Sequence, residues 1–153
     1  MAKIIQPIIA ILICQSAGLV GSFFTVSAIP DWYAGLVKPS FNPPNWVFGP
    51  AWLVFYTLMG IALYLVWQKM PASKLAVIIF LIHLAVNALW SIVFFGLKSP
   101  NWAFLGIIIL WLMILALIIL FYQIDKRASY LLFPYFAWVS FAAVLNFYIW
   151  RLN

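Results

Sequence analysis

The sequence predicts an all-α membrane protein, a bundle of five transmembrane helices with a proline- and aromatic-rich loop between the first two. Hydrophobic residues make up 69% of the 153 residues and charged residues only 7%. A soluble domain carries about a quarter charged residues, because its surface must face water. In addition, five apolar stretches are each long enough to cross a hydrocarbon core, which takes about 20 helical residues.

The five stretches contain no Asp, Glu, Lys or Arg in their interiors. They are continuous apolar runs, whereas the strands of a membrane barrel would alternate polar and apolar residues over about ten positions. Helices are therefore predicted for residues 4–28, 46–67, 75–97, 102–122 and 130–150. Because no change of composition marks a second domain, residues 1–153 are expected to form a single five-helix transmembrane domain.

The net charge of +6 is explained by a membrane rather than by a nucleic acid. All eight basic residues lie in, or at the edges of, the gaps between apolar stretches, where they meet phosphate headgroups. An odd number of helices puts the termini on opposite sides, and the distribution of basic residues then favours a cytoplasmic N-terminus. A lipid bilayer is expected as a partner, and a nucleic acid is not.

The segment of residues 30–45 contains four prolines and three aromatic residues. Its prolines predict a stiff loop that does not continue as one helix. Such a loop can be an interfacial aromatic belt or a lid over a cavity, and its composition does not decide between them.

The residue inventory argues against several classes of function. His83 is the only ionisable candidate for a proton- or ion-coupled transporter, because Asp31 and Asp125 fall between the apolar stretches. The sequence has no phosphate-binding glycine motif, no paired carboxylates and no metal-ligand cluster, so no metal site or required cofactor is expected, and a binding function is favoured over an enzyme, which stays an alternative. We interpret His83 as a hydrogen-bonding residue rather than an axial haem ligand.

Three apolar stretches carry aromatic rings beside small or polar residues at helical spacing. Such stripes line pockets that hold an apolar ligand, but they also pack helices against one another, and spacing alone favours packing. The residues concerned are Trp52, Tyr56, Asn87, Trp90, Ser91, Phe94, Trp138, Phe141, Ala142 and Leu145.

Two further patterns are less specific. Ala17-x-x-x-Gly21 and Gly18-x-x-x-Ser22 overlap on the first stretch, and we interpret them as packing within the monomer rather than as a dimer seam. Leu145, Tyr148 and Arg151 fit a loose sterol-contact pattern that often arises by chance at a headgroup layer.

The loop and much of the remaining sequence resemble the translocator protein family, also called the TspO family or peripheral benzodiazepine receptors. The resemblance implies five transmembrane helices around a pocket, closed by the 30–45 loop, and often a homodimer. It covers nearly the whole chain and rests on residues 32–44, Trp46, Gly49, Pro50, Trp52, Tyr56, 84–87, Trp90, 94–96, 132–135, Trp138, Phe141, Ala142, Leu145 and Asn146.

The resemblance implies a receptor or sensor for porphyrins, such as protoporphyrin IX and haem, for benzodiazepine-type drugs and, in animals, for cholesterol. Tyr33 and Pro43 match the family's lid. Trp52 and Trp138 match a pair linked in some bacterial members to light-dependent porphyrin breakdown, so a porphyrin-degrading enzyme is one alternative function and a lipid or sterol carrier is another. The family's pocket wall is matched by Trp52, Asn87, Trp90, Trp102, Trp138 and Ala142.

Two departures from the family pattern bear on these expectations. Phe41 stands where a tryptophan is common, which keeps a ring but loses an N–H donor. The sequence also ends at Asn153 without the basic tail of animal members. A bacterial cell membrane or outer membrane is therefore expected rather than the mitochondrial outer membrane.

Overall fold

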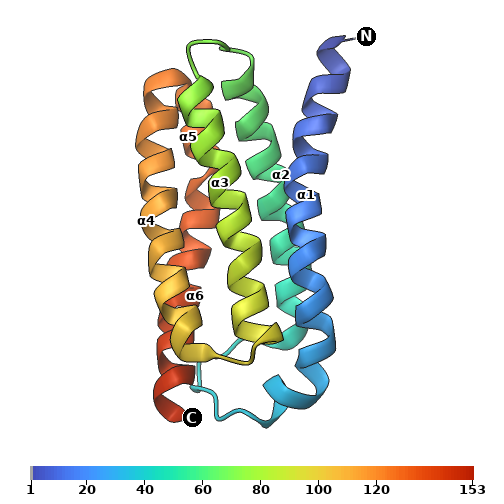
Figure 1. Cartoon of the computed structure of the whole chain (residues 1–153), viewed down its shortest axis with the longest axis vertical. Coiled ribbons are helices and arrows are strands. Elements are labelled where there is room, and N and C mark those ends of the chain that lie inside the picture. The colour runs from blue at the N-terminus through green and yellow to red at the C-terminus, as the bar shows by residue number, and fades with distance from the viewer. Residues whose placement is uncertain (1) are drawn as a thin grey trace.

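The computed structural model describes residues 2–153, with side chains from residue 5 onward, and in this range it is a bundle of helices without strands (Figure 1). Five helical spans are long and apolar enough to cross a membrane, which confirms the predicted fold class and the number of spans. The two ends of the chain lie at opposite ends of the bundle, as an odd number of spans requires.

The observed helices match the predicted stretches to within a few residues at most boundaries. Two of the five spans end in a π-helical turn, and the fifth is broken into two helices. In chain order the elements are α1 (Ala2–Ala28), η1 (Ile29–Tyr33), η2 (Asn45–Val47), α2 (Phe48–Trp67), α3 (Lys74–Ser91), η3 (Ile92–Gly96), α4 (Pro100–Ile124), α5 (Lys126–Leu131) and α6 (Phe133–Leu152).

The first helix continues into the segment that we predicted to be a loop, so the prediction was wrong for its first third. Pro30 and Asp31 lie within η1, and helical structure extends to Gly35, leaving residues 36–44 as the connection. Pro30 is tolerated because it stands near the start of a wider π turn, in which the Ala34 N–H donates to the Ile29 carbonyl. Lys38 ends the helix by donating from Nζ to the carbonyls of Tyr33, Ala34 and Leu36.

The fifth span begins at Lys126, four residues before the predicted boundary. Asp125 caps this helix, since its Oδ1 accepts from the Arg127 backbone N–H at 2.9 Å and Arg127 also donates to both carboxylate oxygens. The Arg127 side chain lowers the pKa of Asp125 below its usual value of 3.8. Charged residues can therefore stand in the first turn of α5, because the Arg127 side chain is 75% exposed.

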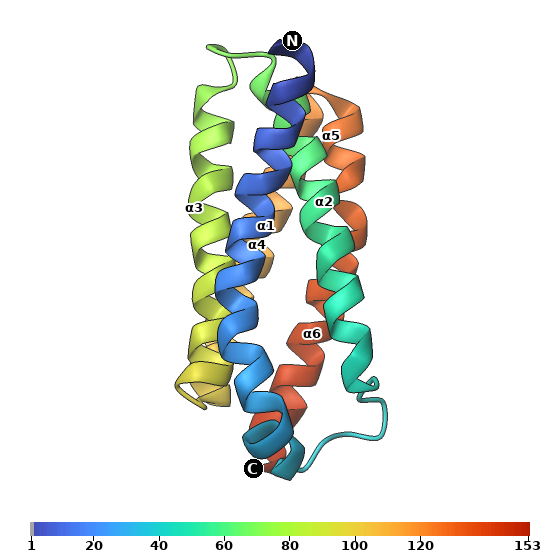
Figure 2. The same cartoon turned by 90° about the vertical axis from the view of Figure 1, so that its right-hand side faces the viewer.

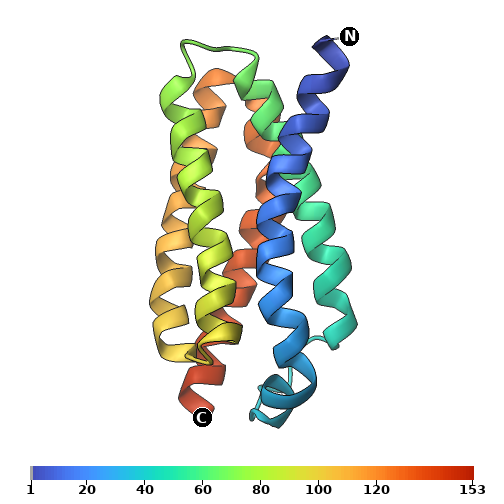
Figure 3. The ribbon, with the colours of Figure 1, turned by 45° about the vertical axis from the view of Figure 1, so that its right-hand side comes forward.

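The packing of the spans leaves one end of the bundle more open than the other. α1 lies between α2 and α3, and α4 packs against α3 and α6 (Figures 2 and 3). At the end that holds the N-terminus, α2 packs against α5. Toward the other end, α2 and α6 are bridged by rings, with the Phe48 and Phe55 centroids 6.0 and 5.6 Å from that of Trp138.

Glycines on α1 and α2 make contacts within the monomer, in agreement with our interpretation of the small-residue motifs. A Cβ on Gly60 of α2 would lie 2.5 Å from Cα of Ile11, so the backbones of α1 and α2 touch at this level. A Cβ on Gly18 would lie 2.5 Å from the Tyr56 ring, and one on Gly21 would lie 3.0 Å from Oγ of Ser91. α1 therefore fits closely against both of its neighbours.

A buried chain of polar side chains connects α2, α3 and α6. The Tyr56 hydroxyl donates to Oδ1 of Asn87, and Asn87 Nδ2 donates to the Tyr135 hydroxyl at 2.8 Å. Tyr135 in turn lies 2.9 Å from Nε2 of His83. The prediction that His83 bonds to a neighbour is confirmed. Its Nδ1 is the one buried side-chain nitrogen or oxygen without a partner among the residues described.

We expect Gly60→Ala to destabilise the bundle by about 1–3 kcal/mol, because a methyl group there overlaps the backbone of α1. Gly35→Ala is the matched control, since a Cβ at Gly35 meets no atom within 4 Å, and its effect should stay within about 0.5 kcal/mol. Reversible unfolding in mixed detergent micelles measures both. Equal stability of the two variants would contradict the close approach of α1 and α2.

A second prediction concerns the polar chain. Tyr135→Phe removes the hydroxyl that pairs with both His83 and Asn87, and it should cost about 1–2 kcal/mol of unfolding free energy. Tyr130→Phe provides the control, because the Tyr130 side chain is 56% exposed at the end of the bundle. If the two phenylalanine variants unfold alike, the chain of hydrogen bonds does not stabilise the fold.

Candidate ligand pocket

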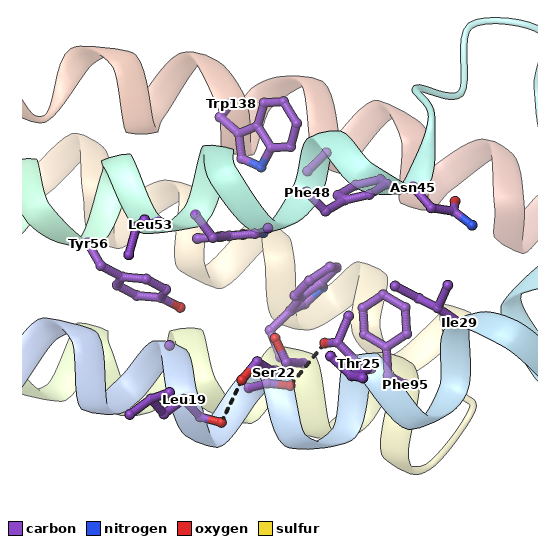
Figure 4. Close-up of a pocket in the computed structure, with 18 of the residues that line it drawn as sticks. Leu19, Ser22, Thr25, Ile29, Asn45, Phe48, Leu53, Tyr56, Phe95 and Trp138 are labelled. Atoms are coloured by element: carbon purple, nitrogen blue, oxygen red, sulfur yellow. Dashed lines mark hydrogen bonds between the residues drawn. The ribbon is translucent and has the colours of Figure 1, made fainter.

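A cavity of about 410 Å³ lies between α1, α2, α3 and α6, toward the end of the bundle that holds the 36–44 connection. It forms where α2 and α6 are bridged only by side chains. Figure 4 shows lining side chains between the ribbons of α1 and α2, and Trp138 extending from α6 toward α2. The structure therefore contains a pocket where spacing alone had favoured simple packing.

The wall is mainly apolar, includes seven aromatic side chains and carries no charged side chain among the residues described. Trp52 and Tyr56 form one side, with ring centroids 5.4 Å apart and planes 28° apart. Trp90 lies on the α3 side and Trp138 on the α6 side. Such a wall suits a flat apolar ring system, because aromatic faces and edges make favourable contacts with other rings.

A few polar atoms interrupt this surface. The hydroxyls of Ser22 and Thr25 bond back to carbonyls of their own helix at 2.9 Å, drawn as dashed lines in Figure 4. Gln15 closes one end of the cavity by donating to Oγ1 of Thr57 and to the Leu53 carbonyl of α2. These bonds satisfy the donors that would otherwise be exposed to hydrocarbon.

Among the residues described, some indole N–H groups have a hydrogen-bond partner and others do not. Trp90 donates to Asn146 at 3.3 Å and Trp111 to Ser140 at 2.8 Å. Within residues 5–153, Trp52 and Trp138 make no comparable bond. Their N–H groups are therefore available to an acceptor atom of a bound molecule.

Six of the predicted site residues line the cavity. They come from three helices that are distant in sequence, and the fold brings them to one place. They are Trp52, Tyr56, Trp90, Ser91, Trp138 and Ala142.

Four other predicted residues lie behind the wall and support it. Asn87, buried, accepts from the Tyr56 hydroxyl. Phe94 stacks on Trp90 at a centroid distance of 5.4 Å. Tyr33 packs edge-on against Phe48, and Leu145 belongs to the same buried cluster as Tyr33 and Phe94.

Two predicted residues lie elsewhere. Trp102 is 65% exposed on α4, outside the cavity. Pro43 lies in the connection, where its carbonyl accepts from Nδ2 of Asn42, and no residue between 30 and 44 lines the cavity. The connection closes the end of the bundle without touching the pocket.

The sterol-contact pattern does not form one surface. Leu145 is buried, whereas Tyr148 and Arg151 are exposed. The Tyr148 ring instead packs against Phe41 of the connection, at a centroid distance of 5.4 Å. His83 is also outside the cavity and is fully buried against Tyr135.

The sequence reasoning missed the contribution of α1. Seven lining residues come from α1, and an eighth, Ile29, begins η1. These residues form a stripe with the i, i+3, i+4, i+7 spacing that could have revealed it. It was overlooked because none of its members is aromatic. They are Gln15, Gly18, Leu19, Gly21, Ser22, Thr25, Val26 and Ile29.

The acidic, basic and thiol side chains of residues 5–153 lie away from the cavity. Among residues 5–153 the structure shows no group of three or more His, Cys, Asp or Glu that could hold a metal ion. The cavity wall carries no carboxylate, histidine or cysteine. Trp52 and Trp138, the pair considered for photo-oxidation, both line the cavity.

Comparisons with known proteins agree with the sequence resemblance. The model of the TspO/MBR family matches residues 10–151. Tryptophan-rich protein TspO of Archaeoglobus fulgidus is 44% identical, over 99% of this chain and 97% of its own length. Translocator protein of Homo sapiens is 37% identical, over 96% and 90%. Tryptophan-rich sensory protein of Cereibacter sphaeroides is 41% identical, over 80% and 77%. With its five apolar spans, this chain therefore belongs to the TspO/MBR family of multi-pass integral membrane proteins.

Proposed function

We propose that this protein is a membrane receptor or sensor that binds porphyrins, such as protoporphyrin IX and haem, in the cavity between α1, α2, α3 and α6. The same proposal covers other apolar ring systems, including benzodiazepine-type drugs and cholesterol. The observation that carries it is a cavity of about 410 Å³ inside the apolar spans, with a mainly apolar wall that includes seven aromatic residues and no charged lining residue. Sites for small molecules typically measure about 300–1,000 Å³ and have mainly apolar walls.

Family membership supports a sensor or receptor role, since relatives carry the names Tryptophan-rich sensory protein and Translocator protein. The choice of a flat macrocycle rests on three of the four lining indoles, those of Trp52, Trp90 and Trp138, each of which can stack on a ring for about 0.5–1.5 kcal/mol beyond area burial. The acidic groups of a porphyrin have no basic partner in the cavity. We place them at its rim beside Asn45, near the headgroup layer.

A porphyrin-degrading enzyme is the second candidate, and it rests on one observation. Trp52 and Trp138 both line the cavity, so a bound ring would lie against two oxidisable indoles. The receptor proposal is preferred because the wall offers no acid, base or metal ligand to complete a reaction.

Self-association stays a prediction from the family resemblance. A groove between α1 and α3, lined by small residues such as Ala17, Ala85 and Ala88, has the character of a surface that admits a neighbouring helix. A bacterial cell or outer membrane likewise stays the expected location, and porphyrin is treated as a ligand rather than a required cofactor.

The first test of the proposal is Ala142→Thr. Ala142 lines the cavity on α6, so a branched polar side chain there should weaken protoporphyrin IX binding about tenfold or more. Ala137→Thr on the same helix is the control, because Ala137 is exposed and outside the cavity. Titration followed by tryptophan fluorescence measures both affinities. Native affinity in Ala142→Thr, with an intact fold, would place the ligand elsewhere.

The second test separates binding from catalysis. Trp138→Phe keeps much of the apolar ring surface but removes the N–H and the easily oxidised indole. A receptor should then show only a modest loss of affinity, and the native protein should yield no new pigment when it is illuminated with protoporphyrin IX. Absorption spectra before and after illumination measure this. Product formation by the native protein that disappears in Trp138→Phe, with binding retained, would establish the enzyme instead. Trp102→Phe, on the exposed face of α4, is the control.

A further inference from the structure

The 36–44 connection is fastened to the bundle away from the cavity. Its Val37 N–H donates to Oδ1 of Asn153 at 3.0 Å, and Nδ2 of Asn153 donates to the Val37 carbonyl at 2.9 Å. The Phe41 ring packs against Phe141 and Tyr148 of α6. These contacts hold the connection over the C-terminal end of α6.

A layer of rings separates this connection from the cavity. Tyr33 is 2% exposed, and it packs against Phe48, Phe94 and Phe95 at centroid distances of 6.4, 6.3 and 5.8 Å. Its hydroxyl donates to Oδ1 of Asn42 at 2.7 Å. A ligand arriving through the connection would therefore have to displace the loop contacts and then this buried cluster.

The side of the cavity between α1 and α2 has a different character. Leu19 and Val26 of α1 line the cavity and are 71% and 68% exposed, and Leu53 of α2 is 61% exposed. Figure 4 shows Leu19 and Leu53 on the two helices that border the cavity. All three residues lie inside predicted membrane spans, so this exposed side faces acyl chains rather than water.

The opening begins where the contact between α1 and α2 ends. Gly60 touches the backbone at Ile11, and Gln15 bridges to Thr57, so this half of the helix pair is closed. Gly18 still packs against the Tyr56 ring of α2, but beyond it the next turns of α1 border the cavity. At the far rim, Trp46 is 74% exposed at the start of the second span, where indole rings favour the headgroup layer. The opening thus runs from the middle of the span to one interface.

From this geometry we infer that ligands enter and leave the cavity sideways, between α1 and α2, from the hydrocarbon of the membrane, while the 36–44 connection stays closed. This inference rests on the proposed function and adds the class of ligand to it. The ligands are compounds that dissolve in the bilayer, with an apolar ring system and polar groups at one edge. Such a molecule can keep its polar edge at the Trp46 rim while its rings pass into the cavity.

The test compares binding rates in lipid nanodiscs, with protoporphyrin IX as the probe and its absorbance as the signal. Ser22→Phe and Leu53→Trp each enlarge a side chain at the opening. They should slow association and dissociation together, about tenfold or more, because a barrier on the path affects both directions. Two variants are used so that the result does not depend on the folding of either one.

Matched controls separate the opening from the rest of the surface. Ser27→Phe repeats the change on an exposed serine of α1 outside the cavity, and Leu112→Trp repeats the other change on a leucine of α4 that is 55% exposed. Asn153→Ala removes both hydrogen bonds between the connection and α6. All three should bind and release the probe at native rates.

Two outcomes would overturn the inference alone. One is faster exchange in Asn153→Ala with native rates in both opening variants, which would place the path at the connection. The other is weaker equilibrium binding in the opening variants without slower association, which would make these residues part of the wall only. Absence of any binding signal from the native protein would instead overturn the proposed function, and this inference with it.

Discussion

The hydrocarbon of a membrane offers no hydrogen-bond partner, so every polar group inside a span has to find one within the protein. Backbone groups meet this requirement by forming helices, and that alone accounts for the five helical spans. Side chains meet it in pairs and chains. The hydroxyls of Ser22 and Thr25 turn back to their own helix, and Gln15 reaches across to α2. The same constraint explains why His83, Tyr135, Asn87 and Tyr56 gather in one buried line.

This line of hydrogen bonds also shapes the pocket. Tyr56 belongs to both, because its ring faces the cavity while its hydroxyl is held by Asn87. Its ring lies against Gly18, where a Cβ would come within 2.5 Å. Tyr56 therefore cannot swing toward α1, and Trp52 stacks on a fixed partner. The hydrogen bonds among Tyr56, Asn87 and Tyr135 thus fix the position of the rings that line the cavity on α2.

Much of the fold could be predicted from sequence, because length and apolar continuity depend on the bilayer and not on tertiary contacts. The pocket was harder to predict for a geometrical reason. Helical spacing gives the direction in which Trp52 or Trp90 points, but not the distance to the facing helix, so a cavity and a packed interface give the same pattern. Asn87 and Phe94 have that direction and prove to be supporting residues behind the wall. We did not predict that the helix continues through Pro30, because the rule that proline ends a helix considers only the α-helical turn. The π-helical turn η1 accommodates the proline ring.

In the half of the bundle that holds the cavity, some polar groups have no hydrogen-bond partner within the described part of the chain. Within residues 5–153, the N–H groups of Trp52 and Trp138 are not paired in the way that those of Trp90 and Trp111 are. A ligand with acceptor atoms would accept hydrogen bonds from these N–H groups, and the uncharged wall would not require a charged ligand.

Recognition would then depend on ring area and on the position of a few acceptors, not on a charge pattern. A site of this kind discriminates weakly among flat apolar molecules, since loss of an apolar contact costs far less than an unpaired buried charge. Under the proposed function, a broad ligand preference would follow from the same absence of water that determines the fold.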